Sequence, residues 1–196
     1  MRRFTVPTGA CLAMLLALTP PPAAHGQAPA PSVPAPDTLG ANFDADRVGR
    51  GTPGDFDFLI GTWSFRFQSR DEQGGYRPVR TGTWTAVKTH GGAIVEDVWR
   101  VGETENPTIT WRVFNPQRGV WEIQGVQPRS GQWHPGIAWS EGDQRFVVQT
   151  FGPMRARIRY YQVTPDHFLW RADGSEDGGR TWVADIWKIE AHRVNL

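Results

Sequence analysis

The chain has 196 residues, with 21 Lys and Arg, 20 Asp and Glu, and ten Trp residues. This near-neutral balance excludes the strongly basic footprint expected of a nucleic-acid-binding protein. The only cysteine is Cys11, close to the N-terminus, so the rest of the chain can form neither an internal disulfide nor a thiolate metal site.

The first 26 residues are predicted to be a signal peptide. Arg2 and Arg3 provide a positive n-region, and residues 10–18 (ACLAMLLAL) provide an apolar h-region that is too short to span a bilayer. Residues 24–26 (AHG) end the segment in small side chains that suit a signal peptidase. Cleavage removes two arginines and no acidic residue, which leaves 19 basic against 20 acidic residues. We therefore expect an exported protein, periplasmic or extracellular, without stable membrane insertion.

The stretch from residue 27 to residue 54 is predicted to be a disordered leader. It is rich in Pro, Ala and Gly, and such a composition buries too little apolar surface to offset the entropy lost on ordering. The stretch can also serve as a spacer between the domain and a surface. A single folded domain is expected over residues 55–196.

Within this domain, residues alternate between apolar and polar in short segments that end in turn sequences such as Asn115-Pro116 and Gly152-Pro153. Short links favour antiparallel neighbours, because a parallel pair needs a long crossover. We therefore predict an all-β fold, a single antiparallel meander barrel. Its strands are expected at residues 63–68, 76–90, 93–101, 108–114, 120–127, 136–140, 145–151, 155–163, 168–172 and 182–192.

The octet SEDGGRTW at residues 175–182 resembles the Asp-box of sialidases and related β-propellers. A propeller needs several four-stranded blades, whereas this domain offers about ten strands and one copy of the motif. In an Asp-box the Ser, Asp and Thr side chains bind turn amides, and the Trp covers the base of a hairpin. We therefore expect Ser175 and Asp177 to hold a hairpin together and not to catalyse glycoside hydrolysis.

The stretch FDFLIGTWSF at residues 56–65 contains Gly61-Thr62-Trp63, which resembles the G-x-W signature of lipocalins and other calycins. With GTWTAV, VEDVWRV, RVFNP, TPDHFLWR and SEDGGRTW it resembles, over nearly all of residues 55–193, a family of exported bacterial proteins. The family has no established activity. The resemblance implies a calycin-like barrel in which the Gly permits close approach and the Trp plugs one end.

A weaker likeness connects the chain to the nitrobindins, a barrel family that binds haem through a histidine late in the chain. Only His167 and His192 lie late here, and neither aligns with that family's ligand motif. No cofactor is therefore expected.

Alternation assigns residues to the barrel interior once Trp63, Trp99 and Trp170 are placed inward. Asp97 then shares an inner face with Trp99, and Arg112 lies inward on the next strand. Aromatic walls with a few charges are typical of ligand pockets, and an arginine suits a carboxylate or phosphate head group. We predict a binding protein for a small apolar or acidic amphipathic ligand. The predicted ligand-binding residues are Asp97, Trp99, Arg112, Arg157 and Trp170.

The place of Arg157 depends on the register of its strand. It shares a face with Arg155 and Arg159, and three arginines on one face are typical of a solvated surface. If Arg157 points inward instead, Asp97 is its charge partner, because a buried charge needs pairing. Such a pair can bind a ligand or simply hold the core.

Two other classes of function remain open. One is a cofactor-less isomerase or hydrolase that uses Asp97 and an arginine, and the other is a structural or interaction protein whose barrel is filled by side chains. The absence of a nucleophile–base motif favours binding over catalysis, so no catalytic residue is assigned. The paired carboxylates Asp97 with Asp185, or Glu96 with Glu190, are the weaker catalytic hypotheses. No metal site is predicted, because the histidines at 90, 134, 167 and 192 lack metal-motif spacing, and only a site assembled in space from separate segments stays open.

Overall fold

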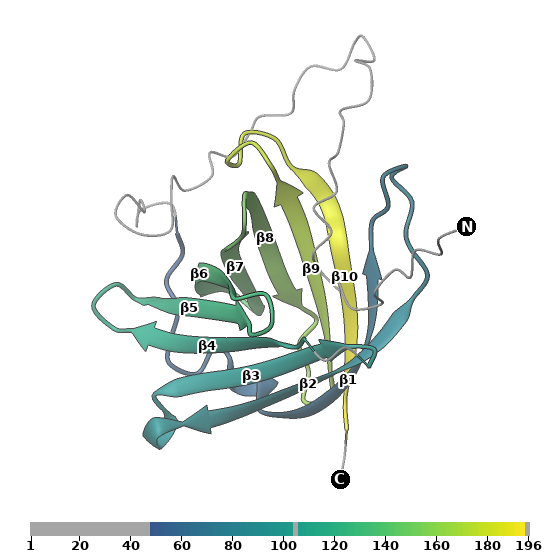
Figure 1. Ribbon diagram of the computed structural model, residues 1–196. Helices are drawn as coiled ribbons and strands as arrows, with labels where there is room; N and C mark the ends of the chain where they lie inside the picture. The colour runs from purple at the N-terminus through teal and green to yellow at the C-terminus, as the bar shows by residue number, and fades with distance from the viewer. Residues whose placement is uncertain (1–47, 104–105, 195–196) are drawn as a thin grey trace.

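The computed structural model describes residues 48–103 and 106–194, which form a closed antiparallel β-barrel (Figure 1). Each strand pairs with its neighbours in the chain, and the last strand pairs with the first. The predicted all-β meander barrel is confirmed. Its ten strands are β1 (Gly61–Ser69), β2 (Arg80–Thr89), β3 (Ile94–Val101), β4 (Thr108–Asn115), β5 (Val120–Gln127), β6 (Gln132–Glu141), β7 (Gln144–Phe151), β8 (Met154–Tyr161), β9 (His167–Ser175) and β10 (Val183–Arg193).

The period-two pattern of each strand separates the inner face from the outer face. In β1 the side chains of Trp63, Phe65 and Phe67 are at most 3% exposed, while Ser64 and Arg66 between them face solvent. Successive side chains of a strand point to opposite faces, so one set of alternate residues fills the barrel. The inner faces together form one hydrophobic core that is rich in aromatic rings.

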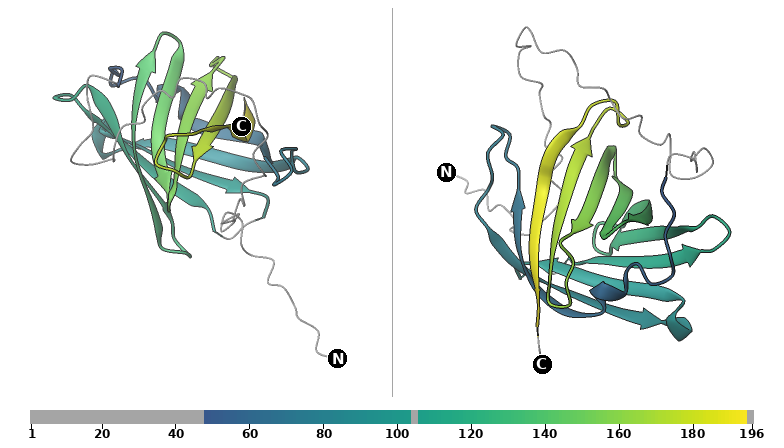
Figure 2. Two further views of the ribbon diagram at one scale, coloured as in Figure 1. Left: turned by 90° about the horizontal axis from the view of Figure 1, so that it is seen from above. Right: turned by 180° about the vertical axis from the view of Figure 1, so that it is seen from behind.

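The barrel closes where β10 runs antiparallel to β1, from Trp63 opposite Arg193 to Ser69 opposite Trp187 (Figure 2). The links after β1, β3, β5, β7 and β9 lie at one end of the barrel, here called the loop end. The opposite end, where β1 begins and β10 finishes, is here called the plug end.

A short helix, η2 (Asp57–Leu59), covers the plug end. Leu59 is fully buried, and its carbonyl accepts a hydrogen bond of 2.8 Å from Nε1 of Trp63. The guanidinium of Arg193 lies 4.1 Å from the centre of the Trp63 ring. A Cβ on Gly61 would lie 2.5 Å from Nη1 of Arg193, and Gly61 has a φ of 120°, so only glycine fits this position. This is the arrangement that the likeness to calycins implies.

Helices contribute little else to the described ranges: η3 (His90–Gly92) is a single turn between β2 and β3. No helix in these ranges is long and apolar enough to cross a bilayer.

The second strand is shorter than predicted. Residues 76–79 were expected to belong to it, but β2 begins at Arg80, and Tyr76 forms only an isolated bridge to Arg70. Pro78 lacks a backbone N–H and so cannot donate to a strand ladder, which explains the later start.

The SEDGGRTW octet forms the turn between β9 and β10, as predicted. The carboxylate of Asp177 accepts hydrogen bonds from Ser175 Oγ, from the amides of Arg180 and Thr181, and from Thr181 Oγ1. These bonds lower the pKa of Asp177 far below its usual range. Nε1 of Trp182 donates to the carbonyl of Gly179 at 3.0 Å. The motif therefore stabilises the turn of a β-hairpin in this protein.

Residues 48–54, which were assigned to the leader, pack against the barrel. The predicted signal peptide and residues 27–47 of the predicted leader lie outside the described residues. Val48, also assigned to the leader, is only 7% exposed and packs against Val120 and Ile137 on the outer wall. The amide of Gly51 donates to the carbonyl of Gly119 at 2.7 Å, so this segment is held against the turn between β4 and β5.

Candidate ligand-binding site

The inner wall of β3 to β7 carries a group of buried polar side chains. Each occupies an inward position of its strand, because its sequence neighbours on either side face outward or into a turn. Buried polar groups cost free energy unless they are hydrogen-bonded, so their clustering on one side of the interior requires an explanation. The group consists of Asp97, Thr108, Thr110, Arg112, Gln127, His134 and Gln149.

Asp97 and Arg112 form an ion pair at the centre of this group. They are 1% and 4% exposed, and Nη1 of Arg112 contacts Oδ2 of Asp97. Nη2 of Arg112 donates to the hydroxyl of Tyr160, on β8, at 3.4 Å. The guanidinium also lies 5.3 Å from the ring centre of Phe56, which comes from the segment before η2. Residues from three separate segments therefore hold the arginine.

Burial shifts the ionisation of this group. It lowers the pKa of Arg112, because the charged form loses its hydration, and the neighbouring Tyr160 partly offsets that shift. Burial also raises the pKa of Tyr160, so the phenol stays neutral and can accept from the guanidinium. The Asp97–Arg112 pair is thus a buried ion pair that is almost inaccessible to solvent and packs against an aromatic ring.

Several polar atoms of the interior have no hydrogen-bond partner among the described residues. They are Asp97 Oδ1, Arg112 Nε and Trp84 Nε1. The ring nitrogens of His134 have no partner at hydrogen-bond distance either, but the backbone of Thr150 lies close enough to interact with the imidazole. An unpaired buried donor or acceptor costs about 1–3 kcal/mol, so such atoms are uncommon unless a bound molecule or solvent satisfies them. Asp97 Oδ1 is an acceptor and Arg112 Nε a donor, and because the two residues form one ion pair, a single polar head group could pair both atoms.

The sequence suggested His134 only as a metal ligand. The structure places its side chain on the inner wall of the barrel. Its side chain is 2% exposed and packs on the ring of Phe151, with 4.6 Å between centroids. Burial lowers its pKa, so the imidazole is neutral and offers one donor and one acceptor. On the inner wall Asp97, Thr110, Gly125 and His134 are successive cross-strand partners. The alternation of residues in β6 could have predicted that His134 lies on the inner wall.

The backbone beside His134 is irregular. Pro135 lies within β6, and the ladder between β6 and β7 ends at Gly136. The side chain of Gln149 replaces the missing ladder bond, because its Nε2 donates to the His134 carbonyl at 2.7 Å. A Cβ on Gly125 would lie 3.0 Å from the same Nε2, so Gly125 leaves room for the Gln149 side chain to cross the inner wall.

Aromatic rings form the rest of the interior. Trp99 is half-buried and lies 6.3 Å from Trp84 and 6.2 Å from Phe65, measured between ring centroids. Trp170 is 5% exposed and stacks on Trp187 at 6.5 Å. The predicted inward placement of Trp99 and Trp170 agrees with these contacts. Their apolar surfaces suit the body of an amphipathic ligand.

Arg157 does not line the interior, and its predicted placement there has to be corrected. It lies on the outer face of β8, where Nη2 donates to Asp173 Oδ2 at 2.8 Å and the guanidinium lies 4.6 Å from the Trp182 ring centre. The reason is that Ile158 and Tyr160, on the other face, are buried. The charge partner of Asp97 is Arg112.

The structure does not bring together the two carboxylate pairs that were considered as catalytic. Asp97 is in the interior, while Asp185 lies at an irregularity of β10, where its amide donates to Asp173. Glu96 accepts from Trp111 Nε1 on the outer wall between β3 and β4, and Glu190 lies on β10. The carboxylate pairs that sequence suggested are therefore on separate strands that are not neighbours.

The tryptophans at 111, 121, 133 and 139 do not form one aromatic-lined space. Trp121 is 2% exposed and belongs to the core. Trp111 stacks on the exposed Trp133, and Trp139 stacks on Phe146. Most of this cluster therefore covers the outside of the barrel.

Comparison with solved structures identifies the fold. The barrel is similar to the S-type phycobiliprotein lyase CPES from Guillardia theta, with a TM-score of 0.53, 11% identity, and coverage of 72% of this chain and 91% of that chain. A protein of unknown function from the DUF3598 family of Nostoc punctiforme matches with a TM-score of 0.49 and 12% identity, over 74% of this chain and 50% of that chain. No protein-family model and no curated protein sequence matches. The likeness to the lyase shows a shared calycin-like fold, and fold alone does not assign an activity.

Proposed function

We propose that the protein is an exported barrel that binds a small amphipathic molecule, with an acidic head group at Asp97, Arg112 and His134 and an apolar body against Trp99 and Trp170. A closed barrel of calycin-like fold is consistent with small-molecule binding. The observation that carries the proposal is the set of unpaired polar atoms in an otherwise aromatic interior. Export rests on the basic n-region, the apolar h-region and the small residues that follow.

The unpaired atoms favour a carboxyl head group. Arg112 Nε needs an acceptor, and Asp97 Oδ1 needs a donor. A carboxylic acid offers both, because one oxygen accepts while the other, when protonated, donates. Burial near Asp97 favours the protonated form of such an acid. A methyl ester of the same chain length accepts but cannot donate, so it can satisfy only one of the two atoms.

The test compares dodecanoic acid with its methyl ester, using quenching or enhancement of tryptophan fluorescence to measure affinity. The unaltered protein should bind the acid in the micromolar range and prefer it to the ester. A double variant, Asp97→Asn with Arg112→Gln, keeps polar groups of similar size without leaving one buried charge unpaired. It should lose the preference for the acid by on the order of 10–100-fold, the equivalent of about 1.5–3 kcal/mol for a charge-assisted hydrogen bond.

Arg157→Gln is the matched control, because Arg157 is also paired with an aspartate but lies outside the barrel. It should bind both molecules as the unaltered protein does. Equal losses for acid and ester in the double variant would mean that Asp97 and Arg112 only support the fold. No binding of either molecule would favour a structural or interaction protein with a filled barrel.

The enzymatic alternative uses the same pair. Asp97 would have to act as a base, but its Oδ2 is in contact with Arg112, which stabilises the carboxylate and weakens it as a base. The geometry therefore supports binding better than proton transfer.

A further inference from the structure

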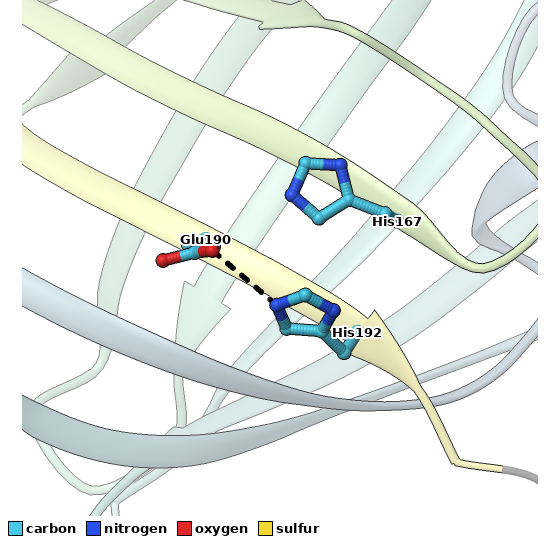
Figure 3. A group of neighbouring side chains, drawn as sticks. All are labelled: His167, Glu190 and His192. Carbon is cyan, nitrogen blue, oxygen red and sulfur yellow. Dashed lines mark hydrogen bonds and ion pairs between the residues drawn. The ribbon is translucent and has the colours of Figure 1, made fainter.

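Outside the barrel, two histidines and a glutamate from β9 and β10 converge near the plug end (Figure 3). His167 and His192 are direct cross-strand partners, and Glu190 precedes His192 by two residues on the same face of β10. The three side chains belong to the outer wall, while the interior site lies on the other face of the sheet. None of them takes part in the proposed ligand site.

The distances between these groups are close to those of a metal centre. The candidate ligand atoms all lie within 4.8 Å of one another, and His192 Nε2 lies 3.4 Å from Glu190 Oε1. Two ligands at about 2.0–2.1 Å from a tetrahedral zinc ion are roughly 3.3 Å apart, so Glu190 and His192 already have the required separation. The rings of His167 and His192 are 4.9 Å apart between centroids. Small side-chain rotations therefore bring the third ligand into range.

The backbone at both histidines is held in place. The carbonyl of His167 accepts from the amide of Thr164 at 2.8 Å and from Thr164 Oγ1 at 3.2 Å. The carbonyl of His192 accepts from Ser64 Oγ at 3.4 Å. A ladder that fixes two ligands opposite each other lowers the entropic cost of binding an ion.

We propose that His167, Glu190 and His192 bind one divalent transition-metal ion, with zinc, copper and nickel favoured over magnesium and calcium. Imidazole nitrogen is a good ligand for zinc, copper and nickel, whereas magnesium and calcium require mainly oxygen ligands. The side chains of Glu190 and His192 are 45% and 56% exposed, so a fourth position is open to water. Arg66 lies opposite Glu190 across β1 and β10.

Isothermal titration of the tag-free protein with zinc chloride tests the site. We expect one ion per chain, with His167→Ala and His192→Ala each weakening binding more than about 10-fold, since even removal of a ligand's supporting partner costs 10–100-fold. Glu190→Gln should weaken zinc binding as well. His90→Asn is the control: it removes another histidine, in a left-handed turn conformation that Asn tolerates, and should leave the titration unchanged. Magnesium chloride should give no comparable binding.

A second measurement guards against a variant that simply loses structure. Zinc should raise the Tm of the unaltered protein and of His90→Asn, because an ion bound only by the folded chain stabilises it. The Tm of folded His167→Gln, verified by circular dichroism, should not respond. Zinc binding of unchanged strength in both His167→Gln and His192→Ala would overturn the site, and so would the absence of binding in the unaltered protein. Fatty-acid binding is unaffected in either case, so the test is independent of the proposed function.

Discussion

Arg112 and Arg157 each pair with an aspartate, but only Arg112 is buried. Breaking a buried pair leaves an uncompensated charge and costs about 3–5 kcal/mol, whereas an exposed pair contributes about 0–1 kcal/mol. Sequence alternation placed Arg112 correctly, because Arg112 lies on the same face of β4 as Phe114, which packs against the core. It left Arg157 undecided, because the opposite face of β8 includes Tyr160, whose polar hydroxyl is satisfied by a partner 48 residues away in the chain. Such a partner is visible only in the folded structure.

His134 should make the folded protein less stable in mild acid. Burial lowers its pKa below the usual 6.5, so between the folded value and 6.5 the unfolded chain binds more protons. Stability from this residue is therefore complete above that window, declines as the pH falls through it, and stays low beneath it. In urea unfolding between about pH 7 and pH 5, His134→Gln should flatten the decline. His90→Asn, which alters an exposed histidine, should retain it, and an unchanged slope in His134→Gln would contradict the assignment.

At the scale of elements, the hairpin of β9 and β10 shows what turn sequences can and cannot predict. The octet fixed the position of the turn, because its Ser, Asp and Thr side chains bond within the loop. The register beyond it changes between Val183 and Trp187, where Asp185 has a φ of 53°. Without this bulge His192 would lie opposite Pro165 instead of His167. A bulge of this kind depends on tertiary contacts, so the histidine cluster could not be derived from spacing.

Asp177→Ala should destabilise this hairpin without changing ligand binding. The substitution removes four hydrogen bonds to the carboxylate, all within the turn. The Tm should fall, while the affinity for dodecanoic acid should stay the same once the protein is folded, since the turn is remote from Asp97 and Arg112. Asp143→Ala, in the exposed turn between β6 and β7, should lower the Tm less. A folded Asp177→Ala protein with weaker ligand binding would place the turn in the site.

At the scale of the whole molecule, the strand count and the antiparallel order were predictable, because nearly every strand ends in a turn sequence. Closure was implied only by the G-x-W resemblance, since pairing of β1 with β10 joins residues far apart in the chain. The packing of residues 48–54 was not predicted. Composition marked residues 48–54 as leader, but Val48 covers Val120 and Ile137, apolar side chains on the outer wall that local sequence gives no reason to cover.

The N-terminal segment should therefore behave as part of the barrel. Val48→Ser exposes the apolar patch of Val120 and Ile137 and should reduce the free energy of unfolding by about 1–2 kcal/mol, most of the value of one buried valine. Val79→Ser is the matched control, because Val79 is 42% exposed, and it should change stability by less than about 0.5 kcal/mol. Urea unfolding followed by tryptophan fluorescence measures both, since Trp139 packs against the same patch. Equal effects of the two substitutions would mean that Val48 does not contribute to the stability of the domain.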